Sequence, residues 1–201
     1  NAAHIEKIVK NGNFDCISVV GGDGTLNQTV NSLSAQQIPI HPIPAGTGND
    51  LVKMVYPNLS QLDIFAKVLS STYQRVDLWQ CNDAYFINGF GSGFDGAVSH
   101  ATHGKQYPLL PKLKYWIEIL KLIINFRSQP LFINGEKRSN FMLAAANGQV
   151  YGGGFKVAPL AFVNDGLLDI IEIAPVPVWK RFLYIPKIER GKHLNLDIIS
   201  H

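Results

Sequence analysis

Glycines, a carboxylate and a threonine stand together in VVGGDGT, residues 19–25. A hydrophobic run ends here and a helical pattern begins near Thr25, so the glycines lie where a strand turns into a helix. Gly21 and Gly22 carry no Cβ, which lets the backbone turn sharply and approach a ligand closely. The first N–H groups of the helix and its positive dipole end favour a phosphate group there. Asp23 repels phosphate, so it either orients water, a ribose hydroxyl or a metal ion, or caps the helix.

A second turn of the same composition follows in HPIPAGTGNDLVKM, residues 41–54. It combines Gly46 and Thr47 with Asn49 and Asp50, between an extended segment and another helical pattern. Asn49 or Asp50 could act only as a cap for that helix. However, turns after successive parallel strands meet at one edge of a sheet, where open α/β sheets bind ligands. The pair therefore favours a ligand site over two unrelated turns.

The surrounding pattern changes character along the chain. In the first third, strand-like runs alternate with helical ones, and Leu26, Val30 and Leu33 form a helical stripe. This alternation predicts an α/β domain with a parallel sheet at residues 1–75. From residue 76 short strands and turns dominate, with a hairpin signal at Asn134-Gly135 and one helix at about 110–126. They predict a mostly antiparallel β domain at residues 76–201.

Composition and charge limit the classes of protein to which this chain could belong. The chain of 201 residues is 46% hydrophobic, and its longest apolar run is broken by Glu118 and Lys121, too early for a membrane span. Residues 1–100 hold 5 Lys/Arg against 8 Asp/Glu, whereas residues 101–201 hold 13 against 7. A basic second half fits a membrane surface, a phosphorylated product or nucleic acid, or simply a solvated lysine face. Cys16 and Cys81 read as reduced thiols of a cytosolic protein, and the histidines form no cluster and read as surface residues.

The two ends of the chain read as cut. The first residues lack an initiating Met and resemble a helix already under way, with neither a signal nor a transit peptide. The last residues, 194–201, stop within a strand-forming pattern. We therefore expect the α/β domain to lack its first strands and the β domain its last ones.

The two glycine turns together resemble the catalytic domain of the diacylglycerol kinase family, which includes sphingosine, ceramide and bacterial lipid kinases. The segments VDLWQCNDAYFINGFGSGFDGAV, residues 76–98, and AAANGQVYGGGFKVAPLAFVNDGLLDIIEI, residues 144–173, resemble the family's second domain. The resemblance covers essentially the whole chain and implies that the second domain is a β-sandwich. The GGDG motif alone is shared with NAD kinases and phosphofructokinases. Only the two glycine turns together are specific to the diacylglycerol kinase family.

The resemblance assigns roles to residues of both domains. The nucleotide phosphates of ATP would be lined by Gly21, Gly22, Asp23, Gly24 and Thr25, and the facing wall of the cleft formed by Gly46, Thr47, Asn49 and Asp50. In similar lipid kinases a loop of the second domain binds Mg²⁺; here it corresponds to FVNDGLL, residues 162–168. The ligands would be the Asp165 carboxylate and the backbone oxygens of Phe162 and Leu167, with waters linking the ion to Asp23 and Asp50. An oxygen-only site suits a hard cation, although Asp165-Gly166 also fits an ordinary turn.

Three features depart from the family pattern. Gln28 stands where many relatives have Glu, which loses a charge but keeps the hydrogen-bonding ability. The family's presumed general base, an Asp in an Asp-Gly-Glu triplet, is absent, since Asp95-Gly96 runs into Ala97 and Asp165-Gly166 into Leu167. The Asn-Pro turn before the first helix is absent too. We attribute the last two gaps to sequence missing at the ends, rather than to loss of catalysis.

Two segments fit contact with a lipid surface. A helix at residues 110–127 would place apolar side chains on one face with lysines around it: Leu113, Trp116, Ile117, Leu120 and Ile124, with Lys112, Lys114 and Lys121. Packing on the β domain is an equal alternative for this helix. The segment VWKRFLYIPKIERGKH, residues 178–193, mixes cations with Trp179, Phe182 and Tyr184, which suits a headgroup region as well as a protein or nucleic-acid contact.

The leading hypothesis is an ATP- and Mg²⁺-dependent lipid kinase acting on diacylglycerol or a related lipid alcohol. It would be cytoplasmic and peripherally attached to a membrane, would not bind nucleic acid, and could form a homodimer. ATP would lie between the two domains. An NAD kinase-like enzyme is the nearest enzymatic alternative, although the loop expected there is replaced by PAGTGND, residues 44–50. A non-catalytic nucleotide- or lipid-binding relative is the other alternative.

Overall fold

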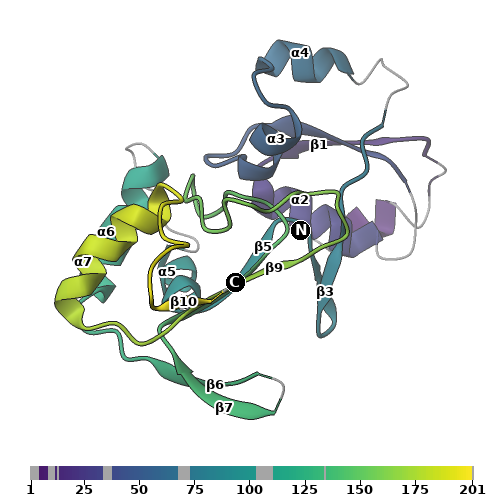
Figure 1. The fold of residues 1–201 in the computed structure, drawn as a ribbon. Helices are drawn as coiled ribbons and strands as arrows, with labels where there is room; N and C mark the ends of the chain where they lie inside the picture. Colours follow the sequence, from purple (N-terminus) through teal and green to yellow (C-terminus); the bar gives the residue numbers. More distant parts are fainter. Residues whose placement is uncertain are drawn as a thin grey trace. The chain divides into compact units, whose positions relative to one another are not determined.

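The structure is a computed structural model of the chain, and it describes residues 5–8, 12, 14–33, 38–67, 73–102, 111–133 and 135–200. The chain divides into two compact units (Figure 1). The first consists of Asn1–Ile87 together with Val163–Gly166, and the second of Asn88–Phe162 and Leu167–His201.

The first unit is built on two parallel strands, β1 (Ile17–Gly21) and β2 (Ile40–Pro44). Their register pairs Ile17 with Ile40 and Gly21 with Pro44, so both strands end at the same edge. The helix α2 (Asp23–Leu33) connects them, and α3 (Asp50–Val55) and α4 (Gln61–Ala66) follow β2. The predicted α/β part with a parallel sheet is therefore confirmed.

Packing in the first unit follows the helical stripe read from the sequence. Leu26, Val30 and Leu33 are all buried on α2, as predicted. Leu26 joins Val19 and Leu51 in a small apolar core, against which Val163 also packs. The expectation that the histidines lie at the surface is wrong for His41, which is buried and bonds through Nε2 to the Ile64 carbonyl, 2.7 Å away.

The first unit also includes a hairpin of β3 (Trp79–Cys81) and β4 (Ala84–Phe86). The Asn31 side chain of α2 donates to the Tyr85 carbonyl and accepts from the Tyr85 N–H, both at 2.8 Å. Because these bonds tie the hairpin to α2, the compact unit extends to Ile87, beyond the boundary that the sequence predicts after residue 75. Cys16 and Cys81 are both free thiols.

The second unit contains a four-stranded antiparallel sheet in the order β10–β9–β8–β5. The strands are β5 (Gly89–Gly93), β8 (Met142–Ala146), β9 (Asp169–Ile173) and β10 (Ile199–Ser200). A separate hairpin joins β6 (Gln129–Ile133) to β7 (Glu136–Asn140). The pairing of Ile133 with Glu136 confirms the hairpin predicted there; Asn134 of its turn lies outside the described residues. The predicted antiparallel β part is confirmed.

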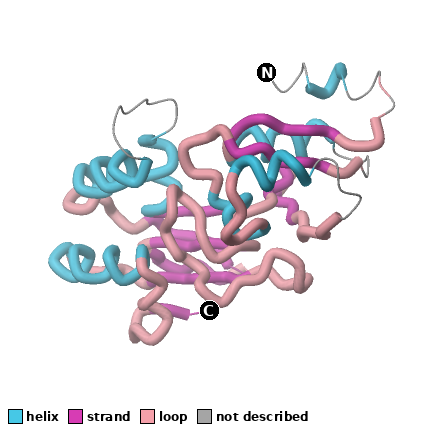
Figure 2. Tube along the Cα trace, turned by 90° about the horizontal axis from the view of Figure 1, so that it is seen from above, coloured by secondary structure: helices cyan, strands magenta, loops and turns pink. Residues whose placement is uncertain are grey.

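In the part of this unit that the structure describes, three helices accompany the sheet: α5 (Phe94–Thr102), α6 (Pro111–Leu122) and α7 (Val178–Glu189). The sequence predicted only α6 as a helix. The two views place α6 and α7 on one side of the strands (Figures 1 and 2). The core between sheet and helices includes Phe141, whose ring stacks on Phe94 with centroids 4.7 Å apart. His193 is fully buried here and bonds through Nε2 to the Val157 carbonyl at 2.9 Å, so it too is no surface residue.

Candidate active site

The first glycine turn lies between β1 and α2. β1 ends at Gly21, and the helix begins at Asp23, two residues earlier than its apolar pattern indicates. The Leu26 N–H donates to the Gly22 carbonyl at 3.0 Å, so the N–H groups of the three preceding residues lie on the open end of the helix. A Cβ placed on Gly24 would meet no atom within 4 Å. The turn thus combines open backbone donors with the positive end of an 11-residue helix.

The second turn is closed by Asn49. Its Oδ1 accepts from the Gly46 N–H at 3.0 Å, and its Nδ2 donates to the Gly46 carbonyl at 2.8 Å. Asn49 adopts a left-handed backbone conformation with φ 54°, which asparagine tolerates better than most residues. Lys53 Nζ donates to the Gly48 carbonyl at 2.6 Å, and Thr47 is exposed at the tip. The Asn49 side chain therefore uses both its Oδ1 and its Nδ2 to shape the turn, and these are the atoms that would otherwise contact a ligand.

The two turns pack against each other. A Cβ on Gly46 would lie 2.3 Å from the Gly22 Cα, so neither backbone leaves room for a side chain at this point. The Asp23 carboxylate then joins the turns, since its Oδ2 accepts from the Asp50 N–H and its Oδ1 from the Leu51 N–H, each at 3.1 Å. Asp23 is thus a helix cap, but for α3 rather than for its own helix. The structure brings all the predicted residues of both turns together at one edge of the parallel strands.

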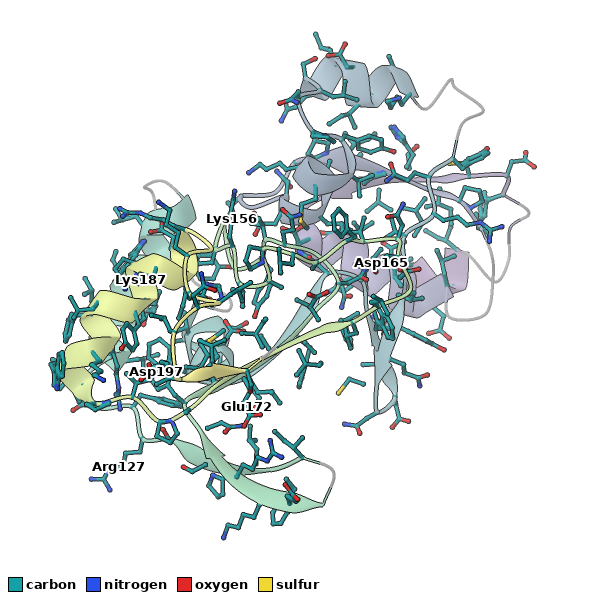
Figure 3. All side chains as sticks on the ribbon, in the orientation of Figure 1. Arg127, Lys156, Asp165, Glu172, Lys187 and Asp197 are labelled. Atoms are coloured by element: carbon teal, nitrogen blue, oxygen red, sulfur yellow. The ribbon has the colours of Figure 1, made fainter. Side chains whose placement is uncertain are left out.

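The segment Val163–Gly166 returns to the first unit although it lies far along the chain. The Asp77 N–H donates to the Val163 carbonyl, and the Gly166 N–H donates to Asp77 Oδ2, both at 2.7 Å. Gly166 has φ +73°, which suits glycine. Asp165, labelled in Figure 3, is exposed and belongs to the same unit as Asp23 and Asp50. Sequence reasoning missed Asp77, because nothing local in VDLW indicates a partner so distant along the chain.

The two backbone ligands expected beside Asp165 lie on either side of this segment. Phe162 and Leu167 are largely exposed and belong to the second unit. Within the described residues, no three or more His, Cys, Asp or Glu side chains form a metal-binding group. A site on this loop would therefore use one carboxylate and backbone carbonyls, with water completing the shell. Such a donor set fits Mg²⁺, which keeps several waters in proteins.

A second polar pair, in the second unit, was not singled out from the sequence. The Tyr151 hydroxyl donates to Asp95 Oδ2 at 3.0 Å, and Asp95 is partly buried on α5. A side chain on Gly91 would overlap the Asp95 carboxylate, so the glycine of β5 makes room for it. Burial raises the pKa of Asp95 to about 6, which the Tyr151 hydrogen bond opposes. Burial and the neighbouring carboxylate raise the pKa of Tyr151 well above its ordinary value.

Comparison with known proteins covers both parts of the chain. Residues 1–81 match the family model of the diacylglycerol kinase catalytic domain, and residues 89–201 match the YegS C-terminal NAD kinase beta sandwich-like domain. The chain is 29% identical over 197 residues to the diacylglycerol kinase of Mycobacterium tuberculosis, covering 92% of this chain and 63% of that protein. It is 30% identical over 164 residues to a probable YegS-like lipid kinase of Chromohalobacter salexigens, covering 75% of this chain and 51% of that protein.

Solved structures agree on the fold. A crystal structure of a diacylglycerol kinase from Bacillus anthracis matches with a TM-score of 0.68 at 23% identity, over 99% of this chain and 67% of that one. The two family models together span nearly all of the residues that form the two units. The chain belongs to the diacylglycerol kinase and YegS-like lipid kinase family.

Proposed function

We propose that the complete protein is an ATP-dependent lipid kinase that phosphorylates the hydroxyl of diacylglycerol or a related lipid alcohol. The observation that carries the proposal is the joining of two glycine turns through Asp23 at the ends of two parallel strands. Family membership supports phosphoryl transfer to a lipid, with ATP as the donor. Within this proposal the protein is cytoplasmic, works at a membrane surface as a peripheral protein, and can form a homodimer.

The phosphates of ATP would bind at the open end of α2. The N–H groups of its first turn donate to phosphate oxygens, and the bare Gly24 lets the phosphates come close. Two accepted hydrogen bonds leave the Asp23 carboxylate with lone pairs that can orient water beside the phosphates. Asn49 and Asp23 keep the second turn rigid, so the donors are positioned before the ligand arrives.

A bound Mg²⁺ would supply positive charge to neutralise the phosphates and to organise water between the loop and the turns. Asp165 with the Phe162 and Leu167 carbonyls would hold the ion, while Asp77 holds the turn that carries Asp165. Asp23 and Asp50 would accept hydrogen bonds from its waters. The general base that removes the proton of the lipid hydroxyl is assigned to no residue of this chain.

The test is phosphate transfer by the complete protein. It is incubated with magnesium and labelled ATP, and separately offered diacylglycerol, monoacylglycerol, sphingosine or ceramide in mixed micelles, or NAD in solution. We expect labelled product with at least one lipid and none with NAD. Transfer to NAD alone would favour the NAD kinase alternative, and nucleotide binding without transfer to any acceptor would favour a non-catalytic relative. Light scattering of the same preparation measures whether it is a dimer.

A further inference from the structure

Three Asp-Gly pairs occur in the chain, at residues 23–24, 95–96 and 165–166. In such a pair the glycine nitrogen can attack the side-chain carboxyl carbon of the aspartate, because glycine has no Cβ to hinder the approach. The N–Cγ bond forms, the carboxyl hydroxyl leaves as water with the amide proton, and a five-membered succinimide ring results. Water then opens the ring at either carbonyl. Opening at the main-chain carbonyl gives isoaspartate, in which the chain runs through the former side chain.

Two of the three pairs lie in helices. Asp23-Gly24 begins α2, and Asp95-Gly96 lies in the first turn of α5. Closing the ring requires the aspartate to leave the helical value of ψ, which is about −42°. Their carboxyl groups are also held elsewhere: Asp23 accepts two main-chain N–H groups at 3.1 Å each, and Asp95 accepts the Tyr151 hydroxyl at 3.0 Å. The fold therefore protects both pairs from cyclisation.

The third pair, Asp165-Gly166, lies outside every helix and strand of the described residues. Residues 164–167 are all exposed, so water reaches the turn that carries Asp165 (Figure 3). Gly166 has φ +73°, and a Cβ placed on it would meet no atom within 4 Å. This pair therefore has the space and the solvent that cyclisation and ring opening need.

Asp77 clamps this turn on both sides of Asp165. Its N–H donates to the Val163 carbonyl, and its Oδ2 accepts from the Gly166 N–H, both at 2.7 Å. The Gly166 nitrogen loses its proton when it attacks, so the bond to Oδ2 must be given up first. A carboxylate can also act as a base and speed the attack, but carboxylates are weak bases at neutral pH. The hydrogen bond to the charged acceptor, by contrast, stabilises the unreacted turn fully, so the clamp slows cyclisation.

We propose that Asp165-Gly166 is a site at which this protein forms isoaspartate, and that Asp77 sets the rate by clamping the turn. Isoaspartate lengthens the main chain by one carbon within the segment Val163–Gly166 and moves the free carboxylate onto Cα. The Gly166 N–H is then displaced from Asp77, and the segment loses one of its two clamps. The altered protein is a substrate for a carboxyl methyltransferase that recognises isoaspartate and uses S-adenosylmethionine. None of this depends on the proposed function.

The first experiment measures where isoaspartate forms. The complete protein is aged at neutral pH and physiological temperature with a chelator, either native or unfolded in urea, and then digested with trypsin. Residues 157–180 form one tryptic peptide, which contains a single Asp-Gly pair and no Asn-Gly pair. Isomerisation changes the retention time of this peptide but not its mass, whereas deamidation of an asparagine elsewhere raises the mass. Labelling by isoaspartyl methyltransferase with labelled S-adenosylmethionine identifies the product.

We expect isoaspartate to accumulate in the 157–180 peptide of the native protein, while the peptides with residues 23–24 and 95–96 stay unmodified. In urea all three pairs should react at comparable rates, because the helices and the clamp are gone. Native protein in which either helical pair reacts as fast as Asp165-Gly166 overturns the assignment of the site.

The second experiment measures the clamp. Asp77→Ala should form isoaspartate at residue 165 faster by on the order of tenfold or more, since a hydrogen bond to a charged acceptor is lost. Asp77→Asn should lie between this variant and the wild type, because the amide Oδ1 still accepts the Gly166 N–H. The matched control Asp83→Asn removes an exposed carboxylate of the same unit and should leave the rate unchanged. Circular dichroism and thermal unfolding establish that each variant is folded before it is compared.

Each outcome decides the role of Asp77. An unchanged rate in folded Asp77→Ala overturns the clamp, and a slower rate overturns it in favour of Asp77 as a base. If Asp77→Ala does not fold, Asp77→Asn decides, because a base loses its effect in this variant and a clamp loses only part of it. The measurements use neither ATP nor lipid, so an inactive kinase leaves this inference intact, and an active one does not support it.

Discussion

The Asp23 carboxylate connects two turns that the chain separates by more than twenty residues. Both of its oxygens accept a backbone N–H from the start of α3. A hydrogen bond to a charged acceptor is worth about 1.5–3 kcal/mol. Asp23 therefore supports the shape of the site as well as any chemistry at the phosphates, and a substitution there changes both.

Asp23→Ala should lower the free energy of unfolding by about 2 kcal/mol and abolish phosphate transfer. Urea unfolding and the lipid kinase assay measure the two effects. Asp63→Ala is the matched control: Asp63 caps α4 through Ser60 in the same unit and is no part of either glycine turn. It should lose some stability together with its helix cap and keep its activity. Full activity of a folded Asp23→Ala protein would show that the carboxylate has no part in the reaction.

Asp95 makes stability depend on pH. Its pKa is about 6 in the folded protein and 3.8 ordinarily, because burial disfavours the charged carboxylate. Between these values the folded state binds more protons, so the free energy of unfolding should fall as the pH rises from about 4 to about 6, by up to about 3 kcal/mol, and then level off. Urea unfolding across this range should show this fall in the wild type and lose it in Asp95→Asn. The exposed Asp83→Asn should retain it; an unchanged profile in Asp95→Asn would contradict the assignment.

At the scale of elements, the site depends on how closely the two turns pack. Gly22 and Gly46 meet backbone to backbone, and no side chain fits between them. Gly24, two residues along the same turn, faces open space. The glycines thus serve two different purposes. Gly22 and Gly46 let the two turns touch, whereas Gly24 leaves room for a ligand.

Gly46→Ala should separate the turns, at a cost of about 1–3 kcal/mol in stability, and weaken binding of a fluorescent ATP analogue. Gly24→Ala provides the comparison. It should leave stability unchanged or raise it by up to about 1 kcal/mol, because alanine favours helices. If phosphates approach this turn, Gly24→Ala nevertheless weakens nucleotide binding. Unchanged nucleotide affinity in both variants would place the nucleotide elsewhere.

The sequence predicts a helix or strand correctly where its regularly spaced apolar residues are the ones that the fold buries. Leu26, Val30 and Leu33 identify α2 because they are the residues that it buries. The pattern of α7 could not be read in this way, since Arg181 lies inside and Trp179 outside. α5 follows β5 directly within the run GFGSGFDG, residues 89–96, whose glycines indicate a turn and not a strand that leads into a helix. The glycine turns were found because their composition is local, whereas Asp77 and the Asp95–Tyr151 pair depend on contacts between residues distant along the chain.

At the scale of the whole molecule, each unit is made from two separate stretches of chain. Val163–Gly166 belongs to the first unit, while the residues before and after it belong to the second. Val163 packs against the core of Val19, Leu26 and Leu51. A change of composition along the sequence can mark the boundary between two domains. It does not show that Val163–Gly166 returns to the first unit, because that return depends on the packing of Val163 and on hydrogen bonds with Asp77.

Val163→Ala should loosen the first unit by about 1 kcal/mol, although residue 163 lies within the stretch that forms the second. Hydrogen exchange should become faster for amides of β1 and α2 and stay unchanged for β8. Ile171→Ala, in the core of the second unit, should produce the opposite pattern. Faster exchange only in β8 after Val163→Ala would contradict the division of the chain.

The return of Val163–Gly166 also has a consequence for synthesis on the ribosome. Residues 88–162 must be translated before the segment that completes the core of the first unit appears. At roughly 5–20 residues per second this interval lasts about 4–15 s. During that time the growing chain exposes Val19, Leu26 and Leu51 without Val163, and the turn that carries Asp165 does not yet exist. Until Val163 has been translated, the core of the first unit therefore stays incomplete, and the turn that carries Asp165 joins that unit only afterwards.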